Sequence, residues 1–196
     1  FISGKLVLKE ACTSISFTYD YSYNLNTAYF TLPFLYKEEY GQSYVYDKDG
    51  NMHDWWTESD TKSFNERAEQ YADFFSNIKV LPDLNANGHF TLGENLADHG
   101  GLQVSFYALK HATEGKKQKK LLGFTPEQRF FIAYSGVWAA NITEKEIRSR
   151  TKSDPHALGE WRVNGALPHI DMWYDAFGVK PGDKMYLPKN ERLELW

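Results

Sequence analysis

The chain has 196 residues, of which 42% are hydrophobic and 16% aromatic, and this is enough for one domain with a hydrophobic core. Its formal net charge of −4 and pI near 5.9 argue against a nucleic-acid partner, and the basic run at 116–120 is predicted to be a solvated loop. No apolar stretch approaches the roughly 20 residues that span a bilayer, so no membrane span is expected in this chain.

Residues 1–44 are rich in Tyr, Phe, Thr and Ser, and they differ in composition from the remainder. Partial alternation of apolar and polar residues over 15–19 favours one or two strands. The first 20 residues also lack the basic and apolar zones of a signal peptide. We therefore predict a strand-rich segment of uncertain register over 1–44 and a separate unit over 45–196.

A short acidic segment partly fits the pattern of a calcium-binding loop. Its side chains stand at loop positions 1, 3, 5 and 12, and they are Asp47, Asp49, Asn51 and Glu58. Position 6 of such a loop requires glycine, whereas Met52 stands there. The sequence therefore favours a plain turn, in which Gly50 allows a positive φ, over a calcium site.

Capping residues and apolar periodicity predict five helices, so the fold class is mainly α (α+β). The helices are expected over 57–77, over 91–111, from 125, from 143 and over 170–177. Thr57, Thr125 and Thr143 are the expected N-caps, and Gly178 is expected to close the last helix. The stretch 154–165 is predicted to be irregular, as segments that carry functional residues often are.

The helix over 91–111 carries two carboxylates, Glu94 and Asp98, four residues apart and therefore on one face. The same face carries small side chains, which suggests that it packs against another part of the protein. A buried carboxylate needs a cation, a metal or several hydrogen bonds, so something positively charged is expected opposite this pair. A second interpretation stays open, because Thr91 and Glu94 also fit a capping box at the start of the helix.

Three segments together resemble the neprilysin-like zinc metallopeptidases. Residues 93–98, Gly-Glu-Asn-Leu-Ala-Asp, are similar to the family's GENxAD signature. Residues 46–56 resemble its DxDGxxxDWW stretch, residues 154–162 resemble its DxHxxGxxR stretch, and family members commonly end in tryptophan, as this chain does at Trp196. The resemblance covers about 44 to 196 and implies the carboxyl-terminal part of a zincin-like, mainly helical catalytic domain.

The resemblance also implies a role for each matching residue. Glu94 would be the glutamate ligand of a catalytic zinc, and Asp98 the carboxylate that orients a zinc-bound histidine. His156 and Arg162 would donate hydrogen bonds to the substrate carbonyl and to the oxyanion that forms on it. Without the resemblance, His156 is interpreted as an ordinary turn histidine and Arg162 as a surface or structural ion-pair residue.

The sequence departs from the family pattern because it contains no HExxH, the helix motif that supplies two zinc ligands and the general base. No two of its six histidines stand four residues apart; they are His53, His89, His99, His111, His156 and His169. His99 lies off the face that carries Glu94, so it is not expected to replace a missing ligand. Zinc binding by this chain is therefore expected to be weak.

Two functions of different class follow. The first is part of a zinc metalloendopeptidase that hydrolyses peptide bonds in oligopeptides, inactive alone and requiring the rest of the catalytic domain. The second is a non-catalytic peptide-binding module derived from that family. A single cysteine, Cys12, excludes an internal disulfide and points to a bacterial homologue that is periplasmic, secreted or at the cell surface.

Overall fold

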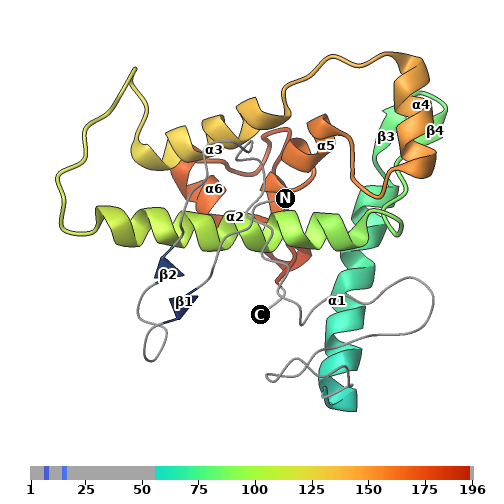
Figure 1. Cartoon of the computed structure of the whole chain (residues 1–196), viewed down its shortest axis with the longest axis horizontal. Coiled ribbons are helices and arrows are strands. Elements are labelled where there is room, and N and C mark those ends of the chain that lie inside the picture. Colours follow the sequence, from blue (N-terminus) through green and yellow to red (C-terminus); the bar gives the residue numbers. More distant parts are fainter. Residues whose placement is uncertain (1–6, 9–14, 17–55, 195–196) are drawn as a thin grey trace.

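The computed structural model describes residues 7–8, 15–16 and 56–194 (Figure 1). The helices of this part are α1 Glu58–Ser76, α2 Leu92–Thr113, α3 Pro126–Trp138, α4 Glu144–Ser153, α5 Gly159–Asn164 and α6 Asp171–Phe177, with single 3-10 turns at Leu167–His169 and Lys189–Glu191. The predicted mainly helical class is confirmed. Cys12, Trp196 and the turn over 47–51 lie outside the described residues, and the division of the chain at 44 and 45 stays a prediction.

Two short antiparallel pairs supply the described strands. β1 (Val7–Leu8) pairs with β2 (Ile15–Ser16), which agrees with the strands expected in the first segment. β3 (Lys79–Leu81) pairs with β4 (Leu84–Asn85) in a hairpin between α1 and α2. Neither pair forms a layer of the fold, so the helices carry the architecture.

The predicted N-caps explain where three helices begin. The hydroxyl groups of Thr57 and Thr143 each accept a hydrogen bond from the backbone N–H three residues on. Thr125 does the same and forms a full capping box, in which the Gln128 side chain accepts from the Thr125 N–H. Gly178 ends α6 in the left-handed region with φ 65°, where a residue without a Cβ is favoured. These four predictions are confirmed.

The prediction of an irregular stretch over 154–165 is wrong for its second half, because α5 occupies Gly159–Asn164. The backbone N–H groups of Trp161 and Arg162 both donate to the carbonyl of Leu158, which starts the helix without a side-chain cap. A helix of six residues is too short to show an apolar period, so the sequence gives no sign of it.

Helix α2 runs through the middle of the molecule, and the other helices are arranged around it (Figure 1). α1 crosses α2 near its amino-terminal end, where α4 packs against β3. α3 packs on both α5 and α6. No helix among the described residues is both long enough and apolar enough to cross a membrane.

Two hydrophobic clusters hold these helices together. One joins α2, α3 and α6 and includes Leu102, Phe106, Phe131, Ile170, Trp173 and Tyr174. The other joins α1 to later segments and includes Phe64, Ala68, Tyr71, Phe75, Ala157 and Leu193. The predicted apolar stripe of α1 is therefore confirmed, with Phe74 only half-buried at its margin. Ala157 extends the second cluster into the stretch that carries the candidate site residues, which fixes that stretch against α1.

Candidate active site

The first turn of α2 is set by hydrogen bonds of Thr91 that differ from a capping box. The Thr91 hydroxyl donates to the carbonyl of Asn87 at 3.1 Å and accepts from the side-chain amide of Asn95 at 2.9 Å. It caps no backbone N–H of the helix, which begins at Leu92. The capping-box interpretation is therefore wrong, and Glu94 is available for another role.

One turn along α2, Asp98 forms a buried ion pair with Arg162 of α5. The Nε and Nη2 atoms of Arg162 donate to the two carboxylate oxygens of Asp98 at 2.6 and 2.7 Å. Each residue is only 4% exposed. The prediction of a positive charge opposite the carboxylate face is confirmed, and the cation is an arginine 64 residues away in the sequence.

The surroundings of Arg162 fix its orientation from two further directions. Its guanidinium lies over the ring of Trp138, 3.8 Å from the ring centroid, and the hydroxyl of Tyr134 donates to its carbonyl oxygen at 2.9 Å. Both of these side chains come from α3, and the sequence analysis did not identify either as a site residue. Aromatic residues recur with the same helical period whether they cover a cation or fill a core. The sequence therefore contains no signal for the contact between Trp138 and Arg162.

Burial and charge act in opposite directions on Asp98. Burial raises the pKa of Asp98 above its ordinary value, and the hydrogen bonds and charge of Arg162 oppose that rise. Because both carboxylate oxygens accept from the guanidinium, we assign Asp98 as ionised. Burial and the nearby Asp98 charge raise the pKa of Tyr134, which therefore stays a neutral hydroxyl. The ion pair of Asp98 and Arg162, joined by two hydrogen bonds, is therefore buried with both partners charged; we call it the buried fork.

Glu94 faces His156, which lies in the loop after α4. The His156 Nε2 atom is 3.1 Å from the Glu94 Oε2 atom. These atoms are within ion-pair distance, yet the buried Oε2 receives no hydrogen bond. Glu94 therefore presents an enclosed oxygen that still has a lone pair to offer, next to an imidazole edge.

Asp154 holds His156 in this orientation. One oxygen of Asp154 accepts from the His156 Nδ1 at 2.8 Å and from the His156 backbone N–H at 3.0 Å. The other oxygen accepts from the Arg150 Nε at 2.8 Å. Partial burial works to raise the pKa of Asp154, but these hydrogen bonds from His156 and Arg150 outweigh it, and the net shift is downward. Asp154 was not among the predicted site residues, although an aspartate two positions before the histidine is a signal for such a contact.

The four predicted site residues therefore meet in two adjacent pairs, Glu94 with His156 and Asp98 with Arg162. The two carboxylates stand one helical turn apart on α2, and both partners come from the segment over 154–162. His156 lies next to Glu94, and Arg162 reaches the same helix face through Asp98. The roles of these residues in binding zinc or an oxyanion stay predictions.

His99 lies away from this group, as expected from its position on the helix. It is fully buried, its Nε2 is 2.7 Å from the side-chain nitrogen of Gln103, and its ring contacts the ring of Tyr71. Burial lowers the pKa of His99 to about 4. His169 contacts the other side of Tyr71, and burial together with the nearby His99 and Arg192 lowers its pKa to about 3. Both imidazoles are neutral core side chains at neutral pH.

Comparison with known proteins gives a consistent result. The model of peptidase family M13 matches residues 37–193. The chain is 37% identical over 158 residues to human membrane metallo-endopeptidase-like 1 and 33% identical over 163 residues to neprilysin-3 of Drosophila melanogaster. These alignments cover 77% and 79% of this chain but 20% of each relative. The chain thus spans about a fifth of the length of these relatives.

A solved structure agrees with the sequence comparison. The chain superposes on the Mycobacterium tuberculosis zinc metalloprotease Zmp1, solved in complex with an inhibitor, with a TM-score of 0.73 and 31% sequence identity. The superposition covers 77% of this chain and 24% of that protein.

Proposed function

The chain belongs to peptidase family M13, a family of zinc metallopeptidases, and we propose that it forms part of the catalytic domain of a zinc metalloendopeptidase that hydrolyses oligopeptides. We assign this role to residues 45–196. The observation that carries the proposal is the pairing of Glu94 with His156 beside the pair of Asp98 with Arg162. Segments more than 60 residues apart thereby bring a carboxylate that we propose as a metal ligand and two cationic or hydrogen-bonding groups to one face of α2.

Glu94 would supply one zinc ligand. Its Oε2 is buried and accepts no hydrogen bond, so a lone pair is available in the place that a ligand needs. When bound, zinc supplies a Lewis acid that activates water and polarises the scissile carbonyl. The printed sequence holds no two histidines four residues apart, so we propose that the other ligands and the general base come from the remainder of the catalytic domain.

With a proton on both ring nitrogens, His156 would act as a hydrogen-bond donor to the substrate through Nε2. Asp154 accepts from its Nδ1, so the Nε2 edge is the one directed toward Glu94. A donor fixed next to a metal ligand is suited to the oxygen that gains negative charge as the peptide bond is attacked. Asp98 accepts from two N–H groups of Arg162, and Trp138 lies against the plane of its guanidinium. We propose that Asp98 positions Arg162 as well as orienting a zinc ligand.

The first test uses the 196-residue chain with its mass confirmed as 22.7 kDa. It should hydrolyse no oligopeptide, and it should lose zinc on dialysis, because one protein ligand and no general base are present. Chelator-sensitive peptidase activity, with zinc retained in equal amount to the protein, would overturn the proposal that the remainder of the domain is required.

A second test examines the role of His156 in an assembled enzyme. The chain is fused in place of the matching segment of a solved M13 peptidase, and hydrolysis of an oligopeptide is followed. His156→Gln should lower kcat about 100-fold with little change in KM, as loss of one oxyanion donor does in other hydrolases. An active chimera whose kcat is unaffected by the change would remove His156 from the proposed site.

The alternative is a non-catalytic module that binds peptides through His156 and Arg162. The absence of HExxH from the printed sequence is the observation in its favour. It predicts that the chain binds a peptide without zinc, and that chelators leave this binding unchanged. Metal analysis of the peptide complex distinguishes the two functions.

We also propose that the protein acts at the cell surface or outside the cell. The support is indirect, since one relative is named a membrane metallo-endopeptidase-like protein. A bacterial periplasmic or secreted location stays a prediction from the single cysteine. Labelling of intact cells with a reagent that does not cross membranes would test it.

A further inference from the structure

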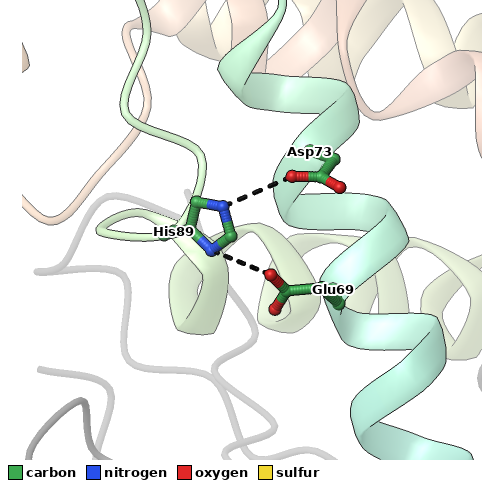
Figure 2. Close-up of side chains that lie close together, drawn as sticks. All are labelled: Glu69, Asp73 and His89. Atoms are coloured by element: carbon green, nitrogen blue, oxygen red, sulfur yellow. Dashed lines mark ion pairs between the residues drawn. The ribbon is translucent and has the colours of Figure 1, made fainter.

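A second group of metal-binding side chains lies on the surface where α1 meets the turn before α2 (Figure 2). Glu69 and Asp73 stand four residues apart on one exposed face of α1, and the ring of His89 lies between their carboxylates. The His89 Nδ1 is 3.8 Å from a Glu69 oxygen, and the His89 Nε2 is 3.4 Å from an Asp73 oxygen. This group shares no residue with the candidate active site.

The spacing of the three side chains is close to that of a metal site. One ligand atom from each residue can be chosen so that all three lie within 4.8 Å of one another. Zinc bonds of about 2.0–2.2 Å place neighbouring ligand atoms in a tetrahedral site roughly 3.3–3.6 Å apart. The His89 Nε2 and the Asp73 oxygen already have that separation. The Glu69 oxygen lies beside the other ring nitrogen, Nδ1, so the exposed Glu69 side chain has to turn toward Nε2 to supply the third ligand.

The backbone holds His89 against α1. The N–H of the preceding residue, Gly88, donates to the Ser76 hydroxyl at 3.1 Å. A Cβ on Gly88 would lie only 2.0 Å from the carbonyl oxygen of Ala72, so the turn touches the helix directly. The amide of Asn85 also donates to the Ser76 carbonyl. The imidazole is therefore presented to the two carboxylates by a fixed turn, and little ordering is needed when an ion binds.

The charge of the group favours a cation. Neither Glu69 nor Asp73 forms an ion pair with a lysine or arginine in the described part of the chain, and their one charged or chargeable partner there is His89. Two carboxylates facing one imidazole leave a net negative charge that a divalent ion would offset. Imidazole selects zinc and similar transition metals over calcium and magnesium, which prefer oxygen ligands alone.

We propose that Glu69, Asp73 and His89 bind one divalent transition-metal ion of the zinc class, with water completing its coordination. The ion links α1 to the turn that leads into α2, the helix of the candidate active site. It is a surface site with three protein ligands, separate from the zinc position assigned to Glu94. Binding therefore stabilises the junction of the two helices and takes no direct part in peptide hydrolysis.

Zinc titration of the full chain tests the proposal, with Glu94→Gln as the common background so that the candidate active site adds no ligand. One zinc ion should bind per chain, and the midpoint of thermal unfolding should rise with zinc concentration. His89→Ala should weaken zinc binding at least tenfold and abolish that rise. Glu69→Gln, which keeps the shape of the side chain, should weaken binding in the same direction.

His111→Ala provides the matched control. His111 is also exposed and lies 3.6 Å from one carboxylate, that of Glu114, but it is not part of a group of three metal-binding side chains in the described residues. Its replacement should leave zinc affinity unchanged, and magnesium should not compete. The proposal is overturned if the background chain binds no zinc, if His89→Ala and Glu69→Gln bind zinc as tightly as the background does, or if His111→Ala weakens binding equally.

Discussion

Replacing Asp98 by asparagine would test whether the ion pair with Arg162 is excluded from water. Both oxygens of Asp98 accept from Arg162, at 2.6 and 2.7 Å, and each residue is 4% exposed. An amide of the same shape has one acceptor and places N–H groups against the second guanidinium donor. Removing one partner of a buried pair typically costs about 3–5 kcal/mol, because the other charge is left uncompensated. A domain of this kind has only about 5–15 kcal/mol of stability, so the loss should be large.

Denaturant unfolding at neutral pH measures the effect, and Asp83→Asn is the matched control. Asp83 also accepts two hydrogen bonds from one guanidinium, from Nη1 and Nη2 of Arg148 at 3.0 and 2.9 Å, but its side chain is 64% exposed. Arg148 holds the pKa of Asp83 below its ordinary value, yet solvent screens such a pair. We expect no measurable loss of unfolding free energy for this control. Each aspartate accepts two hydrogen bonds from one arginine, so the difference between the two variants chiefly reports burial.

Two results would refute this reasoning. One is an equally small loss for Asp98→Asn and Asp83→Asn, which would mean that water reaches the Asp98 pair. The other concerns the double variant Asp98→Asn with Arg162→Met, in which the uncompensated charge is gone. It should recover part of the lost stability. A double variant whose loss equals the sum of the two single losses would show that the residues do not act as a pair.

Three further outcomes are expected. Glu94→Gln should leave the free energy of unfolding unchanged or raise it, because it neutralises a buried oxygen without a hydrogen bond; a large loss would show that a positive charge, on His156 or on a bound ion, stabilises the carboxylate. The free energy of unfolding should fall as pH drops from about 6.5 to 4, by about 1.4 kcal/mol per pH unit for each of His99 and His169. The reason is that the unfolded chain binds protons in this range and the folded chain does not. Unfolding measured across this pH range checks the prediction, and a flat profile would contradict it. Gly88→Ala should destabilise the protein by about 1–3 kcal/mol, because the added Cβ would lie 2.0 Å from the carbonyl oxygen of Ala72 in α1. Gly136→Ala is the control: there is open space around this glycine, so the change should be neutral or stabilising. Equal thermal midpoints for the two variants would be inconsistent with the Gly88 contact.

The local features of the fold could be predicted from sequence because short-range hydrogen bonds determine them. Thr57 and Thr125 cap helices that follow directly, and each needs only a partner three residues away. The same locality limits the prediction at Thr91. A threonine followed three residues later by glutamate satisfies both a capping box and a carboxylate face. The capping box does not form because the Thr91 hydroxyl donates to the carbonyl of Asn87, a residue that no capping pattern includes.

The site itself could be predicted only in part. The spacing of Glu94 and Asp98 correctly indicated a positive partner, since buried carboxylates require one. It could not indicate which cation, because Arg162 is brought in by the packing of α5 on α3 and by the hydrophobic cluster that these helices share with α2. The covering ring of Trp138 was unpredictable for the same reason. The resemblance to the family was enough to identify the four candidate residues. Only the three-dimensional structure showed that they form two adjacent pairs.

The buried fork between Asp98 and Arg162 also constrains the order of events while the chain is being made. At a synthesis rate of about 5–20 residues per second, the ribosome adds Arg162 roughly 3–13 seconds after Asp98, because 64 positions separate them. Throughout that interval the Asp98 carboxylate has no arginine, so desolvating its side of α2 is unfavourable. Nascent α2 should therefore remain hydrated on this side until α5 emerges. The face of α2 that carries Asp98 is completed late, and a ribosome stalled before Arg162 would display a helix that has not yet docked.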